Sequence, residues 1–197
     1  IIAEAKLLAD PQCFDTLNKT IHTVTEPEKR MMGFIYNKKI IETTRVVERG
    51  KLPVEAYEEE IKRAVLDENN DNIIISAGTG AGKTTKVPQY IYRILKPGER
   101  VAVTQPRRLP TESLAGRVAK EMGVTLGREV GYSHGKGRKV SKDTRLLFTV
   151  EKSLLIQLAE DPYLTRYNYV MVDEWHERHK DTDMLVSLLQ RAQELRR

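Results

Sequence analysis

Residues 77–84 read Ala-Gly-Thr-Gly-Ala-Gly-Lys-Thr, and they directly follow the β-branched run Ile73–Ser76. A short apolar run that ends in closely spaced glycines predicts a buried strand that turns tightly, and the residues beyond it predict a helix. Glycines let the backbone N–H groups of such a turn curl around a phosphate at the start of the helix. The segment therefore predicts a phosphate-binding loop, although the glycines alone would also fit a flexible turn without a ligand.

Two side chains of this loop carry its chemistry. Lys83 can reach the β- and γ-phosphates of a nucleotide, and the hydroxyl of Thr84 can ligate Mg²⁺. The usual pattern begins with glycine, whereas Ala77 stands at that position here. The residues that we expect to contact ATP or another NTP are Gly78, Thr79, Gly80, Ala81, Gly82, Lys83, Thr84 and Thr85.

The chain beyond residue 50 alternates between helical and extended patterns. Helices are predicted at residues 54–65, 87–95, 111–122, 153–159 and 184–195, and strands at 73–76, 100–104, 145–150 and 169–172. Strands separated by helices predict an α/β domain, 51–197, with a mostly parallel sheet flanked by helices. Residues 1–50 show no long alternation and are interrupted by prolines, so we expect an N-terminal extension of short helices and loops.

Composition narrows the class of protein. The chain has 197 residues, 40% of them hydrophobic, and its single cysteine, Cys13, excludes internal disulfides and thiolate zinc clusters. Because no apolar stretch approaches the about 20 residues of a membrane helix, and no secretory leader is recognisable, we expect a protein of a reducing, intracellular compartment. The first residue, Ile1, indicates processing or a piece of a longer protein.

Charge is concentrated in residues 100–145, which contain eleven basic and four acidic residues. Such a surplus suits a polyanion such as a nucleic acid, and a solvated surface is the alternative. Within this segment, Arg107 and Arg108 follow the predicted strand 100–104, at the end where parallel sheets meet their ligands. The two arginines can therefore reach backbone phosphates, although Pro106 could equally mark a simple helix-start turn with solvated arginines.

A second motif, Tyr-Val-Met-Val-Asp-Glu-Trp-His, occupies residues 169–176. A buried strand that ends in two carboxylates suits a nucleotide hydrolase, in which Asp173 holds Mg²⁺ and Glu174 orients and deprotonates the attacking water. On its own, this pattern is weak evidence for a nucleotide hydrolase. It becomes stronger evidence here because it lies 89 residues beyond a predicted phosphate loop, and the topology of a parallel sheet can bring the ends of the two strands together. His176 and His179 are three residues apart rather than four, which argues against a zinc site.

Together, the glycine loop, Thr104-Gln-Pro-Arg-Arg108 and Asp173-Glu-Trp-His-Glu-Arg178 resemble the first RecA-like domain of the DEAH-box (DExH) superfamily 2 helicases. The resemblance extends from about residue 52 to residue 197. It implies an NTP-dependent helicase that prefers RNA, with a P-loop NTPase fold and bound Mg²⁺. It implies that Lys83, Thr84 and Asp173 contact the Mg·NTP and that Glu174 is the catalytic base. It also implies that His176 couples the nucleotide site to neighbouring motifs and that Arg117 stacks on the nucleobase. Contacts with the nucleic-acid backbone are implied for Arg107, Arg108 and Thr149.

The chain also departs from that family. Trp175 stands where alanine is usual, and residues 133–140 and 149–153 replace two of the family's blocks, so we interpret the chain as a divergent member and include a viral origin among our hypotheses. The sequence ends before the Ser-Ala-Thr motif, and we expect a second RecA-like domain with arginine fingers as a partner in the parent protein. Two other functions remain open, a phosphotransferase such as a nucleoside kinase and a non-catalytic nucleic-acid or protein binding module.

Overall fold

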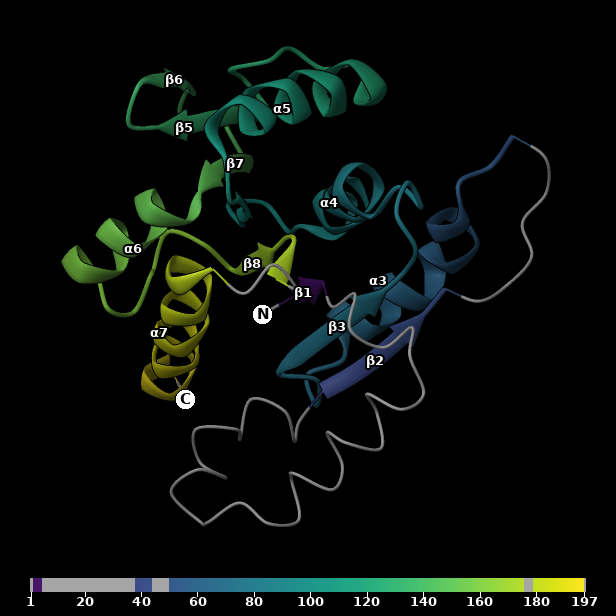
Figure 1. The fold of residues 1–197 in the computed structure, drawn as a ribbon, viewed down its shortest axis with the longest axis horizontal. Coiled ribbons are helices and arrows are strands. Elements are labelled where there is room, and N and C mark those ends of the chain that lie inside the picture. The colour runs from purple at the N-terminus through teal and green to yellow at the C-terminus, as the bar shows by residue number, and fades with distance from the viewer. Residues whose placement is uncertain (1, 5–37, 44–49, 176–178, 197) are drawn as a thin grey trace.

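The computed structural model describes residues 2–4, 38–43, 50–175 and 179–196 (Figure 1). These residues form a sheet with the strand order β2-β3-β1-β8-β4-β7-β5-β6, in which every neighbouring pair is parallel except β5 and β6. The strands are β1 (Ile2–Glu4), β2 (Lys38–Glu42), β3 (Asn72–Ser76), β4 (Val101–Gln105), β5 (Val130–His134), β6 (Gly137–Lys139), β7 (Leu146–Val150) and β8 (Tyr169–Val172). The α/β prediction of a mostly parallel sheet is confirmed.

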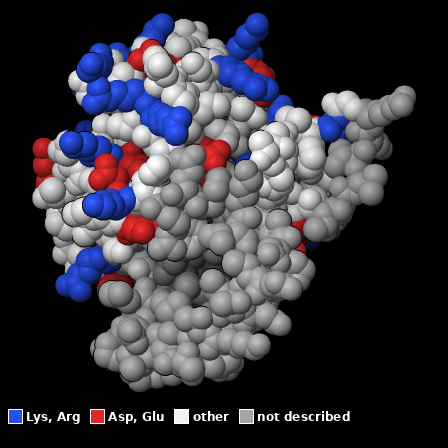
Figure 2. Space-filling view, in the orientation of Figure 1, with Lys and Arg blue, Asp and Glu red and all other residues white. Residues whose placement is uncertain are grey.

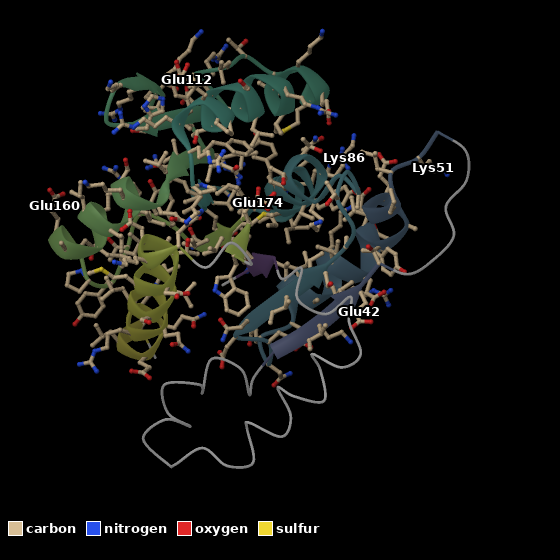
Figure 3. All side chains as sticks on the ribbon, in the orientation of Figure 1. Glu42, Lys51, Lys86, Glu112, Glu160 and Glu174 are labelled. Carbon is tan, nitrogen blue, oxygen red and sulfur yellow. The ribbon has the colours of Figure 1, made fainter. Side chains whose placement is uncertain are left out.

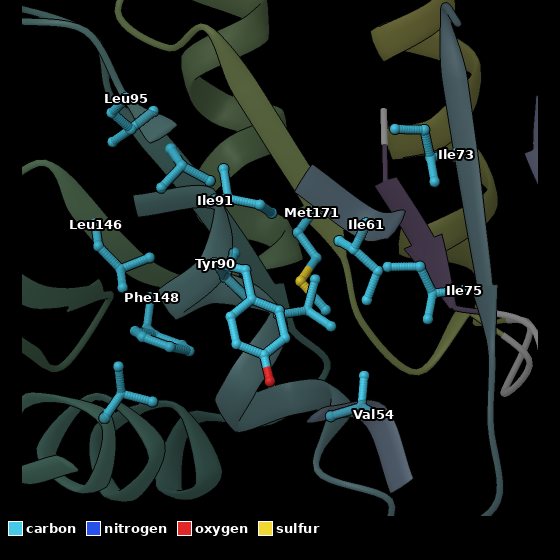
Figure 4. Close-up of a cluster of buried hydrophobic side chains, with 14 of the residues drawn as sticks. Val54, Ile61, Ile73, Ile75, Tyr90, Ile91, Leu95, Leu146, Phe148 and Met171 are labelled. Atoms are coloured by element: carbon cyan, nitrogen blue, oxygen red, sulfur yellow. The ribbon is translucent and has the colours of Figure 1, made fainter. Parts of the chain in front are cut away.

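Helices cover both faces of this sheet. A 3-10 turn (Pro53–Tyr57), α3 (Glu58–Leu66), α4 (Lys83–Ile94) and α5 (Arg108–Met122) pack on one face, where Ile61, Ile91 and Val118 join one buried cluster (Figure 4). On the other face, α6 (Glu151–Glu160) and α7 (Lys180–Arg196) form a second cluster. No helix among the described residues is long and apolar enough to cross a membrane.

The central strands are buried from both sides, which explains their continuous apolar sequences. In β4, Val101 and Val103 face the first cluster and Ala102 faces the second. Each fully buried aliphatic or aromatic side chain, such as Phe148, stabilises the fold by about 1.5 to 3 kcal/mol relative to an exposed position. The strands of a parallel sheet that is covered on both faces therefore do not alternate between polar and apolar residues.

The predicted helices and strands beyond residue 50 are all present, but the first helix, expected at 54–65, divides into the 3-10 turn Pro53–Tyr57 and α3, which begins at Glu58. The other four helices begin earlier than expected. Helix α4 begins at Lys83 because Gly82, with φ of 89°, ends the loop in the left-handed conformation and leads directly into the first turn. The hairpin of β5 and β6 is an addition to the predicted strands. It overlaps the block at residues 133–140 that we expected to depart from the family's pattern.

The expectation of only short helices and loops in residues 1–50 is wrong at two places. Ile2–Glu4 forms β1, which lies between β3 and β8, and Lys38–Glu42 forms β2, which pairs with β3 along its whole length. Both segments are too short to show alternation, and their backbone hydrogen bonds come from strands distant in the sequence. Apart from Thr43 and Gly50, the other residues of this stretch lie outside the described part of the chain, and the domain boundary at residue 50 stays a prediction.

Candidate functional site

The candidate site lies at the carboxyl edge of the sheet. Because β3, β4 and β8 run in the same direction, the segments that follow them meet at one edge. They surround a cavity of about 720 Å³. Its lining includes the loop residues 79–85, Gln105, Arg107, Arg117 and Glu174, so the structure brings together residues from all three predicted motifs.

Glycine is required at two positions of the loop. Gly80 and Gly82 have φ values of 76° and 89°, a region that residues with a Cβ rarely adopt. At Gly82, a Cβ would also lie 2.7 Å from Cδ1 of Leu52, a distance at which something must shift. The loop is further held by the N–H of Val54, which donates to the carbonyl of Ala81 at 3.1 Å. Its path therefore depends on residues that precede β3 as well as on its own glycines.

Two side chains at the end of the loop are buried, and a third lines the cavity. Lys83 is buried, and its Nζ donates to the carbonyl oxygens of Ala77 at 2.6 Å and Gly78 at 3.0 Å. Thr85 is also buried, and its hydroxyl donates to the carbonyl of Gly82. Thr84 is half-buried and lines the cavity. The ammonium group thus lies inside the loop, and the hydroxyl of Thr85 supports the first turn of α4.

Asp173 and Glu174 follow β8 in different environments. Asp173 is fully buried, with Oδ1 accepting the backbone N–H of Glu174 and Oδ2 accepting the side-chain amide of Gln105. Glu174, labelled in Figure 3, follows β8. It is half-buried, lines the cavity and has φ of 52°. A non-glycine residue in the left-handed region costs about 1 to 3 kcal/mol and persists only where its surroundings enforce it. Such strain is characteristic of functional positions, and here it occurs at the expected base.

The oxygen ligands near the loop fit Mg²⁺ better than zinc. The hydroxyl of Thr84 and the carboxylate of Asp173 are hard donors, and Mg²⁺ in nucleotide sites uses few protein ligands because it keeps waters and binds substrate phosphates. The described residues contain no group of three or more His, Cys, Asp and Glu side chains that could hold a metal ion. His179 is exposed, and His176, expected to couple the sites, lies outside the described residues.

Arg117, the expected base-stacking residue, lies at the mouth of the cavity and is oriented by Glu121. Its Nε donates to Oε1 of Glu121 at 2.9 Å, while Oε2 of the same carboxylate accepts bonds from Gln89 at 2.8 Å and Lys86 at 3.2 Å. Burial alone would raise the pKa of Glu121, but the bonds from Arg117, Gln89 and Lys86 lower it below its ordinary value. The carboxylate therefore stays charged and holds the arginine near the cavity.

The same network extends to the phosphate loop. Lys86 also contacts Glu55 at 3.4 Å, and Oε2 of Glu55 accepts the backbone N–H of Leu52 at 2.8 Å. Leu52 in turn packs against Gly82. A chain of contacts thus connects Glu121, beside Arg117, with the loop. Sequence analysis missed Glu55, Glu121 and Gln105, and only the position of Gln105 inside the Thr-Gln-Pro-Arg-Arg block gave a signal.

The three residues expected at nucleic acid are separated by the structure. Arg107 is exposed and lines the nucleotide cavity, whereas the exposed Arg108 lies beside Gly135 of the hairpin. Thr149 is fully buried, and its hydroxyl donates to the carbonyl of Ser133 at 2.8 Å. In this structure Thr149 therefore offers no exposed atom to a ligand and positions the hairpin instead.

Trp175, which stands where alanine is usual in the family, packs against the second hydrophobic cluster.

A parallel sheet with a glycine loop, a buried aspartate and a strained glutamate around one cavity defines a P-loop NTPase domain. Comparison with known proteins narrows this class, because the profile of the family described as DEAD/DEAH box helicase matches residues 56–196. The chain belongs to that family.

Three of the similar proteins are larger proteins from a plant and a yeast. The pre-mRNA-splicing factor ATP-dependent RNA helicase DEAH10 of Arabidopsis thaliana is 39% identical over 150 residues, which cover 75% of this chain and 21% of that protein. The ATP-dependent RNA helicase DEAH13 of the same plant is 36% identical and the probable ATP-dependent RNA helicase DHR1 of Saccharomyces cerevisiae 39% identical, each over 75% of this chain and 12% of the relative. The chain thus spans about a fifth or less of these relatives, and they lend no support to a viral origin.

Proposed function

We propose that this chain is the ATP-binding domain of an NTP-dependent RNA helicase or remodelling translocase. The observation that carries the proposal is the single cavity shared by the loop residues 79–85 and Glu174, with the buried Asp173 held behind it. The similarity to three proteins named as ATP-dependent RNA helicases supports the same function. We further propose that it acts inside the cell, in the nucleus or the cytoplasm.

In the proposed mechanism each residue acts from the position described above. Lys83 and the N–H groups at the start of α4 bind the phosphates. Thr84 and Asp173 would hold Mg²⁺, which when bound would supply positive charge to the transferred phosphoryl group. Glu174 accepts a proton from the attacking water. Arg117, oriented by Glu121, stacks on the base, a contact that does not distinguish among NTPs by hydrogen bonding.

The remaining parts of the proposal concern partners. Arg107 and Arg108 are exposed after β4 and would bind backbone phosphates of RNA. A second RecA-like domain of the parent protein would supply arginine fingers, and His176 would couple the nucleotide to the neighbouring motifs. In phosphoryl transfer such a finger contributes about 10³ to 10⁵ in rate.

The proposal is tested with the longest protein that contains this chain, by measuring inorganic phosphate released from Mg·ATP with and without single-stranded RNA. We expect release that rises severalfold with RNA. Transfer of the phosphate to an added nucleoside would instead support the phosphotransferase. Binding of ATP and RNA without any turnover would support the non-catalytic module.

A further inference from the structure

A second cavity, of about 670 Å³, shares no lining residue with the nucleotide cavity. It is bordered by the end of β5 and the hairpin, by the segment between β6 and β7, and by α6. Its lining extends from Gly135, beyond the carboxyl end of β5, to Arg100, just before the amino end of β4. Because β4 and β5 both run parallel to β7, this lining reaches from the carboxyl ends of the strands to their amino ends. We call it the hairpin groove.

The hairpin groove is strongly positive. Arg100, Arg138, Lys142 and Arg166 line it, and no aspartate or glutamate does. Arg138 and Lys142 are exposed, and no carboxylate in the described part of the chain pairs with either of them. Figure 2 shows lysine and arginine side chains gathered over the part of the molecule that holds α5, β5 and β6. A concave surface with one sign of charge concentrates ligands of the opposite sign.

The other lining groups suit a polymer that carries more than phosphate. Ile156 of α6 borders the groove with 55% of its surface exposed, an apolar contact for a base or a ribose. Ser141 and Ser153 offer hydroxyl groups, and the buried Tyr167 donates its hydroxyl to Oε1 of Gln157 at 3.1 Å. Charged, polar and apolar groups along one extended surface match a single-stranded nucleic acid better than an isolated anion.

The groove is continuous with the expected RNA contact. An ideal Cβ on Gly135, which lines the groove, would lie 4.0 Å from Nη2 of Arg108. The hairpin is fixed at this place because the buried ring of His134 contacts Oε1 of Glu112 in α5 through Nε2 at 2.6 Å. Gly137 packs so closely that a Cβ there would lie 3.0 Å from the His134 ring. Phosphates that bind Arg108 would therefore lie next to the entrance of the groove.

We propose that the hairpin groove, through Arg138 and Lys142, is an additional binding site for the phosphate backbone of the single-stranded RNA that contacts Arg108. The inference rests on the proposed function and adds to it a path for the RNA around the edge of this domain. Two of the four basic residues that line the groove, Arg138 and Lys142, lie in the hairpin and in the segment that follows it.

The test compares two double variants with the same change in charge. Arg138→Gln with Lys142→Gln removes two cations from the groove, and Lys120→Gln with Arg128→Gln removes two exposed cations of the same basic segment that line neither cavity. Binding of a fluorescein-labelled oligouridine of about 16 nucleotides is followed by anisotropy over a range of salt concentrations. Circular dichroism confirms that each variant is folded.

We expect the groove variant to bind the long oligouridine about five- to tenfold more weakly than the control, with the slope of log affinity against log salt reduced by about 1.4 for two lost phosphate contacts. Equal affinity of both variants for the long oligouridine would overturn the inference.

A third variant separates this inference from the proposed function. If Arg107→Gln with Arg108→Gln weakens RNA binding while the groove variant matches its control, the inference fails and the proposed RNA contact stands. If the arginine pair has no effect while the groove variant is impaired, the groove is supported and the role of the pair is wrong. If neither variant changes binding, both proposals fail.

Discussion

The side-chain amide of Gln105 donates a hydrogen bond to Oδ2 of Asp173, joining the ends of β4 and β8 across 68 positions of sequence. Both residues are buried, and the other carboxylate oxygen, Oδ1, accepts the backbone N–H of Glu174. The orientation of the expected Mg²⁺ ligand is therefore set by the last residue of β4, the strand that leads to Arg107 and Arg108. Residues held in this way around a metal ligand commonly contribute 10- to 100-fold in metal affinity, which is about 1.4 to 2.7 kcal/mol.

Gln105→Ala removes this donor and leaves Oδ2 of the buried Asp173 without it. We expect the Mg²⁺ concentration needed for half-maximal ATP binding to rise about tenfold, because the carboxylate loses its fixed orientation. Titration of Mg²⁺ with a fluorescent ATP analogue measures this midpoint. Gln193→Ala is the matched control, since its amide also donates a hydrogen bond, to the carbonyl of Asp71, away from the cavity. An unchanged midpoint in Gln105→Ala would contradict the positioning role.

Glu174→Gln and Asp173→Asn should separate base from metal ligand. Glu174→Gln keeps its backbone bond to Asp173, so we expect normal Mg·ATP binding and turnover lowered by about 10² or more in the longer protein. Asp173→Asn should weaken the Mg²⁺-dependent binding itself. Binding titrations and single-turnover rates for both variants check this division. Equal loss of binding in the two would show that the roles are not divided in this way.

Lys83→Ala should remove the dominant phosphate contact. Because a charged hydrogen bond contributes about 1.5 to 3 kcal/mol, we expect ATP affinity to fall about 10- to 100-fold. The fold should persist, since the ammonium group lies within the loop, where it donates to the carbonyls of Ala77 and Gly78, and the melting temperature should change by a few degrees at most. Lys96→Ala, at an exposed turn after α4, serves as control. Near-normal ATP binding by folded Lys83→Ala would refute the assignment.

Glu121→Gln should loosen Arg117 and the contacts that lead to the loop. The pKa of Glu121 is lowered from its ordinary 4.5, so its charged form stabilises the fold above that pH, and this contribution disappears as the pH falls through the lowered pKa. At neutral pH we expect a loss of about 0.5 to 1 kcal/mol in the free energy of unfolding. Urea titrations at several pH values should show the difference narrowing in acid, and a constant difference would contradict this account.

The chain alone should hydrolyse ATP very slowly. An arginine finger is worth about 10³ to 10⁵ in rate, and we expect it from a second domain. RNA-stimulated hydrolysis by residues 1–197 is therefore compared with that of a longer protein at equal concentration. RNA binding by the chain alone should also be weak and steeply salt-dependent. Full activity of residues 1–197 would mean that the chemistry needs no group from elsewhere.

Several features of this protein are determined by short stretches of its sequence. Gly80 and Gly82 predict the loop because only glycine readily adopts their positive φ values, and that requirement is local. The apolar run before Asp173 predicts a buried strand for the same kind of reason, since covered strands need uninterrupted apolar side chains. The α/β fold class, the order of the motifs and the edge of the sheet at which they meet could therefore be deduced from the sequence alone.

Only the tertiary structure decided which distant groups touch. The bonds of Gln105 with Asp173, of Gln89 with Glu121 and of His134 with Glu112 join residues 68, 32 and 22 positions apart. No local pattern encodes such pairs, because they depend on strand order and on how each helix packs against the sheet. The same holds for β1 and β2, which are strands because β3 and β8 supply their hydrogen bonds. It also holds for Thr149: contact with nucleic acid would require an exposed side chain, but the pairing of β5 with β7 leaves this residue completely buried.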